Sequence, residues 1–117
     1  MARPLRILIA GGWYHVTARG NERREIFRSD RDRQRFLALV SELPDRYGVG
    51  IHAFVLMDNH YHLLVQTAEA NLNHAIRWLN VGYAIWFNWK HRRVGHLFQG
   101  RYGSEVIEEI KIQWGRS

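Results

Sequence analysis

A hairpin pattern at the centre of the chain constrains the fold more than any other feature. Ile51 to Met57 is a strongly apolar run, Asp58-Asn59 is a turn signal, and His60 to Gln66 follows as a second strand. A two-residue connection of this kind joins antiparallel neighbours. The sequence therefore predicts a β-hairpin over residues 51–66, around which the rest of the chain must be arranged.

A strand and a helix are expected before the hairpin. Trp13 to Ala18 is rich in strand-forming residues and stops at a turn signal. Ser29 is expected to cap a helix whose apolar residues recur at helical spacing until Gly48 ends it. Because Pro44 lies inside this pattern, we expect it to kink or shorten the last turn.

A helix and a strand are expected after the hairpin. Asn71 is expected to cap the helix, and the basic run Lys90 to Arg93 suits the negative end of its dipole. His96 to Tyr102 is expected to form the fourth strand. The resulting order is that of the split βαβ, ferredoxin-like arrangement, an α+β fold. It predicts a four-stranded antiparallel sheet with two helices on one face, which leaves the other face open to a ligand.

Composition and charge limit the class of protein. The 117 residues suffice for one domain, and the absence of cysteine excludes a disulfide scaffold and a thiolate metal site. No apolar run approaches the roughly 20 residues of a membrane span, so we expect an unprocessed cytoplasmic protein without a membrane partner. Residues 1–35 carry nine basic and four acidic side chains, and residues 71–103 carry five basic and none acidic. Two such blocks attract polyanions, although a solvated basic surface has the same composition.

His60-Tyr61-His62 is the sharpest candidate for chemistry. Side chains alternate across a strand, so His60 and His62 are expected on one face, with Cα atoms about 6.6 Å apart. Two imidazoles at this spacing can bind one divalent ion, although surface polarity alone also produces such pairs. Tyr61 and Leu63 are then expected to face the core. A metal on the open face of a basic domain suggests phosphodiester chemistry on single-stranded DNA or RNA.

Several ordered motifs resemble one family. Met57 to Val65 resembles the M-x-N-H-x-H-L-L signature of the HUH-type tyrosine transposases, and further matching stretches follow the family order. These stretches are Tyr14 to Asn21, Asp32 to Phe36, Tyr47-Gly48 and Gly95 to Tyr102. The resemblance covers about residues 3 to 104, and the REP-associated branch is the more similar one.

The resemblance implies a ferredoxin-like transposase domain over residues 1–104 that binds single-stranded DNA with a hairpin, as a monomer or a homodimer. It implies that His60 and His62 bind Mg²⁺ or Mn²⁺, and that this metal polarises the scissile phosphate. In the family, a tyrosine hydroxyl attacks that phosphate and leaves a 5′-phosphotyrosine and a free 3′-OH. Rejoining to another 3′-OH completes DNA transposition.

The tail over residues 105–117 departs from the family pattern. The family tyrosine lies on a helix after the fourth strand, and a Gln or Asn one turn later completes the metal site. Here the tail holds no tyrosine, and Glu109 stands four residues before Gln113, the candidate amide ligand. We therefore expect a truncated or frameshifted member, with Tyr102 as the nearest candidate nucleophile and Glu109 as a further oxygen ligand. Tyr83 is expected in the core.

Basic and amide side chains flanking the first and fourth strands are expected to contact DNA phosphates. They are Arg19, Asn21, Arg23, Arg24, Arg92, Arg93 and Arg101. Asn59 is expected to brace the hairpin turn, and Gln99 to face the open side of the sheet. Of the remaining histidines, His15 is the one most favoured to lie near the site.

Three functions stay open from the sequence. The first is a transposase-family protein with metal-dependent DNA cleavage, and the second is a non-catalytic nucleic-acid-binding module, such as a repressor or a transposase relic. The third is an RNA-binding ferredoxin-like domain, which the lack of an RNP-type strand motif disfavours. A covalent protein–DNA adduct would separate the first from the second.

Overall fold

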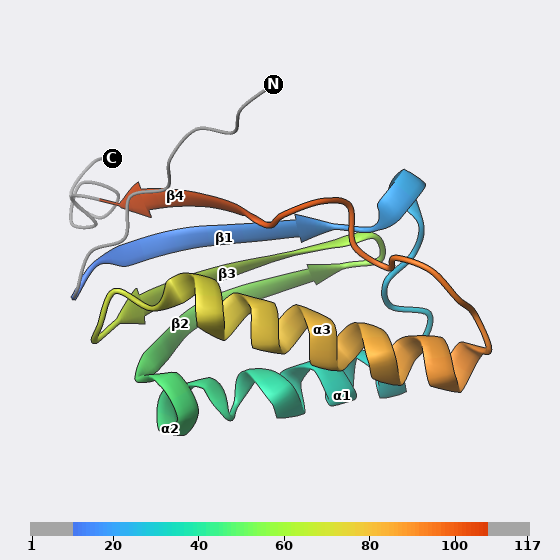
Figure 1. Cartoon of the computed structure of the whole chain (residues 1–117), viewed down its shortest axis with the longest axis horizontal. Helices are drawn as coiled ribbons and strands as arrows, with labels where there is room; N and C mark the ends of the chain where they lie inside the picture. The colour runs from blue at the N-terminus through green and yellow to red at the C-terminus, as the bar shows by residue number, and fades with distance from the viewer. Residues whose placement is uncertain (1–10, 108–117) are drawn as a thin grey trace, which may run out of the picture.

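The computed structural model describes residues 11–107, in which α1 and α3 cover the same side of a four-stranded sheet (Figure 1). The elements are β1 (Trp13–Arg19), the 3-10 turn η1 (Asn21–Arg23), α1 (Asp30–Val40), α2 (Leu43–Tyr47), β2 (Val49–Met57), β3 (His60–Thr67), α3 (Leu72–His91) and β4 (Gly103–Ile107). The strand order is β2-β3-β1-β4, and each neighbouring pair is antiparallel. The predicted ferredoxin-like α+β fold is therefore confirmed.

The predicted helix start at Ser29 and helix end at Gly48 are both present, but the helical stretch between them is divided into α1 and α2. Ser29 is the N-cap of α1, and its side-chain oxygen accepts the backbone N–H of Asp32 at 3.4 Å. Pro44 lies in the first turn of the short helix α2, where a missing N–H costs nothing, so the chain breaks between α1 and α2. Gly48 ends α2 with a φ of 67°, a left-handed conformation that glycine adopts without strain.

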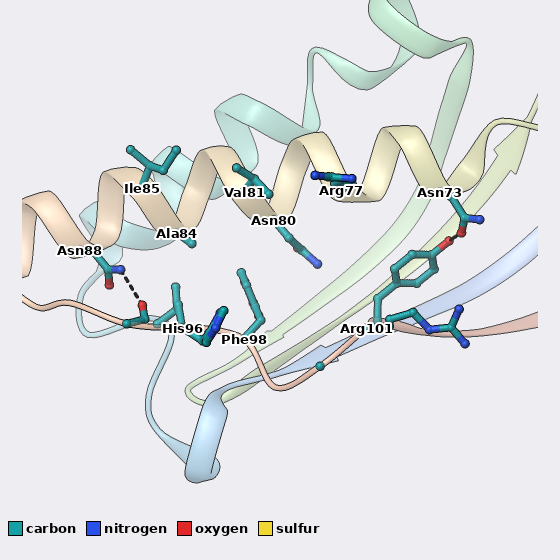
Figure 2. A pocket seen from close by; sticks show the side chains of 14 residues that line it. Asn73, Arg77, Asn80, Val81, Ala84, Ile85, Asn88, His96, Phe98 and Arg101 are labelled. Atoms are coloured by element: carbon teal, nitrogen blue, oxygen red, sulfur yellow. Dashed lines mark hydrogen bonds between the residues drawn. The ribbon is translucent and has the colours of Figure 1, made fainter. Parts of the chain in front are cut away.

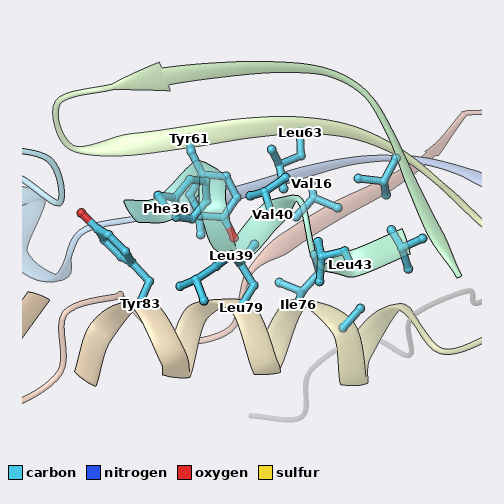
Figure 3. Close-up of a cluster of buried hydrophobic side chains, with 14 of the residues drawn as sticks. Val16, Phe36, Leu39, Val40, Leu43, Tyr61, Leu63, Ile76, Leu79 and Tyr83 are labelled. Carbon is cyan, nitrogen blue, oxygen red and sulfur yellow. The ribbon is translucent and has the colours of Figure 1, made fainter. Parts of the chain in front are cut away.

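One face of the sheet packs against the helices and forms the core (Figure 3). From β3, Tyr61, Leu63 and Val65 are buried, as the alternation along the strand predicts. The ring of Phe36 from α1 lies 4.7 Å from that of Tyr61, measured between centroids. Tyr83 from α3 is also buried, as predicted, and its hydroxyl donates to the carbonyl of Ile26. The alternate residues of β1 and β3 therefore project from the opposite, open face.

The longest helix, α3, is amphipathic over its 20 residues. Asn71 occupies its N-cap position, as predicted, but the side chain instead donates from Nδ2 to the carbonyl of Tyr47 at 2.8 Å. The side of α3 that faces away from the core exposes Val81 and Ile85 to solvent. Within residues 11–107, no helix combines the length and hydropathy that a membrane span requires.

Asp32 joins the start of α1 to the end of α3. Its carboxylate is fully buried and accepts from Lys90 Nζ at 2.7 Å and from the backbone N–H of Arg28 at 2.9 Å. The ring Nε2 of His91 lies 2.9 Å from the same carboxylate. We refer to Asp32, Lys90 and His91 as the aspartate cluster. Because it connects elements far apart in the sequence, it fixes how α1 and α3 pack.

The prediction of a fourth strand over His96 to Tyr102 was wrong, because β4 is Gly103–Ile107. Gly95 and Gly100 take left-handed φ values of 91° and 57°, which turn the intervening segment out of the sheet. Outside the named strands, this segment makes one isolated bridge, between Gly20 and Phe98. β4 lies on both sides of the expected domain boundary after residue 104. The expected tail ligands at positions 109 and 113 lie outside the described residues.

Candidate metal and nucleic-acid site

Three histidines meet on the open face of the sheet. His60 and His62 project from the same face of β3, as predicted, with ring centroids 5.0 Å apart. His15 reaches them from β1, where its Nε2 lies 2.8 Å from Nδ1 of His62. Thr17 stands opposite His62 in the β1–β3 register, and its Oγ1 lies 3.3 Å from the same Nδ1. We call His15, His60 and His62 the histidine cluster.

The hydrogen bonds of the two β3 histidines leave one ring nitrogen of each available. Asn59 Oδ1, an acceptor, lies 2.8 Å from Nδ1 of His60, so this Nδ1 carries the proton and Nε2 keeps its lone pair. The Nδ1 of His62 faces His15 and Thr17, and its Nε2 has no partner among the described residues. A ring whose Nδ1–H is held by a neighbour, as at His60, presents Nε2 to a divalent cation, and His62 would do the same with its Nδ1–H donated to His15 or Thr17. Asn59, expected to brace the turn, therefore also orients His60.

The surroundings favour the neutral form of His62. Burial lowers its pKa, and the neighbouring rings of His15 and His60 and the guanidinium of Arg19 lower it further. A neutral imidazole is the form that binds metal. The two Nε2 atoms do not make a complete site, however. Among residues 11–107, no group of three or more His, Asp or Glu side chains is placed to hold a metal ion.

A groove of about 850 Å³ runs along β1 beside the cluster, and we call it the histidine groove. Two of the predicted DNA-binding residues, Arg19 and Arg101, line it, as does Gln99. Glu105 is the one carboxylate among its described lining residues, and it stands opposite His15 in the β1–β4 register. A cationic groove next to imidazoles suits a phosphodiester backbone.

Tyr102, the candidate nucleophile, lines the histidine groove but directs its hydroxyl elsewhere. The hydroxyl donates to Oδ1 of Asn73 on α3, on the helix side of the sheet. Tyr61 lies in the core, where burial raises the pKa of its hydroxyl, so it faces away from the histidine cluster as expected. The hydroxyl of Tyr102 must leave Asn73 before it can approach a phosphate near His62.

The other predicted DNA-binding residues lie in or next to η1 and just after the end of α3. Asn21 and Arg23 belong to η1, and Arg92 is the C-cap of α3 with a left-handed φ of 53°. Arg93 Nη1 donates to Asn88 Oδ1 at 2.8 Å. Burial lowers the pKa of the Arg93 guanidinium, and the nearby Arg24 and Arg28 lower it further. We call Arg24, Arg28 and Arg93 the arginine cluster.

Sequence reasoning missed Thr17 and Arg28 as neighbours of the predicted site residues. Thr17 shares the open face with His15 because both alternate along β1, a signal that becomes usable once the pairing of β1 with β3 is known. Arg28 belongs to the basic N-terminal block, yet nothing in the block distinguishes it from the other arginines. Its place beside Arg93 depends on how α3 packs.

The comparisons with known proteins identify the family. The chain belongs to the family described as "Transposase IS200 like", whose model matches residues 9–114. The solved structure of a REP-associated tyrosine transposase bound to a REP hairpin is similar at a TM-score of 0.75 and 18% identity, covering 97% of this chain and 66% of that one. A candidate transposase from Deinococcus radiodurans is similar at a TM-score of 0.66 and 14% identity, covering 97% of this chain and 89% of that one. No curated protein matches.

Proposed function

We propose that this chain binds single-stranded DNA carrying a hairpin, and that His60 and His62 hold a divalent cation, Mg²⁺ or Mn²⁺, next to it. The observation that carries the proposal is the pair of unpartnered Nε2 atoms on the open sheet face, beside the cationic histidine groove. The solved REP hairpin complex of a protein with the same fold supports a hairpin as the partner. We infer a cytoplasmic protein, acting as a monomer or homodimer.

The residues present fit such a cation in the type of ligand that they offer. Two neutral imidazoles would contribute Nε2 ligands, and Asn59 and His15 would hold the rings in place. When bound, the cation supplies Lewis-acid polarisation of a phosphate oxygen. Gln113 stays the proposed source of a further oxygen ligand. Arg19 and Arg101 would neutralise the DNA backbone on either side of the reacting phosphate.

Strand cleavage is the finer part of the proposal, with Tyr102 as the nucleophile. The Tyr102 hydroxyl would give up its proton as its oxygen forms a bond to phosphorus, the bond from phosphorus to the 3′ oxygen would break, and the 3′ oxygen would take up a proton. The products are a 5′-phosphotyrosine and a free 3′-OH. The hydrogen bond from Tyr102 to Asn73 favours the second candidate function, a non-catalytic DNA-binding module.

A labelled DNA hairpin with a single-stranded flank, incubated with Mn²⁺, tests both levels of the proposal. We expect salt-sensitive binding that is at least tenfold tighter than binding to a blunt duplex of the same length. Equal affinity for the two DNAs would contradict the hairpin assignment. A denaturing gel then separates the two functions, because a covalent adduct that disappears in Tyr102→Phe assigns cleavage to Tyr102. Salt-sensitive binding without an adduct assigns the non-catalytic module. Comparison of the affinities for this DNA hairpin and a matched RNA hairpin tests the third function, that of an RNA-binding domain.

A further inference from the structure

A second groove, of about 590 Å³, lies between α3 and the segment from Gly95 to Tyr102 (Figure 2). Its volume falls within the roughly 300–1,000 Å³ of small-molecule sites. Asn73 and Asn80 line it from α3 and Phe98 from the facing segment, so we call it the asparagine groove. No carboxylate is among its described lining residues, whereas Arg77 and Arg101 are. This lining suits a ligand that is flat, rich in acceptors and negatively charged.

The hydrogen bonds of the two asparagines leave donors facing the groove. Oδ1 of Asn80 accepts from the hydroxyl of Tyr61 at 2.7 Å, and this contact fixes the orientation of the amide. Its Nδ2 has no partner among the described residues, and the side chain points from α3 into the groove (Figure 2). Oδ1 of Asn73 likewise accepts from Tyr102. The unused amide groups are therefore donors, which match the carbonyl oxygens and ring nitrogens of a nucleobase.

Phe98 offers this groove a firmly held aromatic ring. The ring is half-buried and packs edge-on against Tyr61, with centroids 6.1 Å apart and planes at 88°. Its contact with Tyr83, at 6.4 Å between centroids, supports it from the core side. A base that stacks on an aromatic side chain contributes binding energy whatever its sequence.

The asparagine groove adjoins the histidine groove. Gly100, Arg101 and Tyr102 line both, from the two sides of a single stretch of chain. A DNA strand whose backbone contacts Arg101 would therefore lie next to both grooves.

We propose that the asparagine groove holds one unpaired base of the bound strand, stacked on Phe98, with a carbonyl oxygen facing Nδ2 of Asn80. The inference rests on the proposed binding of single-stranded DNA, and it adds a base-binding site on the helix side of the sheet. The occupant is the bound DNA strand itself, because the two grooves adjoin along residues 100–102 and both have arginine in their lining.

Two oligonucleotides test the site. One is a ten-nucleotide oligothymidylate, and the other is an abasic sugar-phosphate strand of the same length and charge. The variant is Ala84→Leu, which fills the groove with an aliphatic side chain that cannot stack on a base. Ala38→Leu is the matched control, because Ala38 is exposed on α1 and lines neither groove.

We expect the unmodified chain and Ala38→Leu to bind oligothymidylate about tenfold more tightly than the abasic strand, and Ala84→Leu to lose most of that preference. The affinity of all three for the abasic strand should be equal. A preference that survives in Ala84→Leu, or equal binding of both strands by the unmodified chain, overturns the base site and leaves the proposed function standing. No binding of either strand by the unmodified chain also overturns the base site, and the hairpin DNA with a single-stranded flank then tests the proposed function separately.

Photo-crosslinking of the unmodified chain to 4-thiothymidine oligonucleotide gives a result that does not depend on any variant folding. We expect crosslinks at residues that line the asparagine groove, which are Arg77, Asn80, Val81, Ala84 and Ile85 on α3 and residues 96–98 on the facing segment. Crosslinks confined to β1 and β3 would contradict the proposal.

Discussion

The aspartate cluster and the histidine cluster both contain histidine, but their partners differ. In the first, His91 and Lys90 converge on the fully buried carboxylate of Asp32, which also accepts a backbone N–H. In the second, His62 has a second imidazole, that of His15, and a threonine hydroxyl as its neighbours. The first arrangement balances charge and satisfies its hydrogen bonds, whereas the second leaves two ring nitrogens without partners.

The difference separates a structural role from a binding role. Removing one member of a buried charge cluster strands the others without partners, so such a cluster stabilises the packing of α1 on α3. Imidazoles on the open face that keep Nε2 without a partner contribute little to packing but suit a cation, and the lowered pKa of His62 favours the neutral form that binds one. Substitutions in the two clusters should therefore change different properties of the protein.

The largest expected effect on stability follows Asp32→Asn. The amide keeps the size of the side chain but removes the charge that Lys90 and His91 share. We expect the free energy of unfolding to fall by about 3 kcal/mol, measured by urea denaturation at pH 7. His62→Ala is the comparison, with an expected change below about 1 kcal/mol because its ring lies on the open face. Equal losses in the two variants would contradict the distinction between the clusters.

The same variant should also change the pH dependence of stability. Burial raises the pKa of Asp32, but hydrogen bonds from Lys90, the backbone of Arg28 and His91 outweigh it and hold the pKa below its usual value. The stabilisation is therefore present above the unfolded-state pKa of about 3.9 and is lost as pH falls through the lower folded-state value. Asp32→Asn should lack this loss below about pH 4. If the acid unfolding curve of Asp32→Asn matched that of the unmodified chain, this role of the Asp32 carboxylate would be contradicted.

A smaller effect is expected from the arginine cluster. Arg93→Gln removes one charge that lies beside Arg24 and Arg28, where a phosphate would relieve their mutual repulsion. We expect affinity for the hairpin DNA to fall about fivefold, with the slope of log affinity against log salt reduced by about 1. Arg31→Gln, an exposed arginine on α1, is the control and should change the affinity little. The same loss of DNA affinity in both variants would indicate a general effect of net charge and contradict a specific role of the arginine cluster.

The parts of this structure that sequence predicts are those set by local spacing. The hairpin, the N-cap at Ser29 and the common face of His60 and His62 follow from alternation and capping patterns, and the structure has all three. The fourth strand was misplaced because Leu97 and Phe98 look like strand residues, whereas they belong to a segment between two glycine turns in which Leu97 is buried and Phe98 half-buried. The contact of His15 with His62 depends on the β1–β3 register, which local patterns do not specify.

Titration with Mn²⁺, followed by electron paramagnetic resonance, tests the central claim most directly. We predict that the unmodified chain and the control His74→Ala, an exposed histidine on α3, bind Mn²⁺ equally. The double variant His60→Ala/His62→Ala should lose Mn²⁺ affinity by at least tenfold while keeping its thermal stability within a few degrees. Full Mn²⁺ affinity in the double variant would contradict the assignment of these two imidazoles as the cation site.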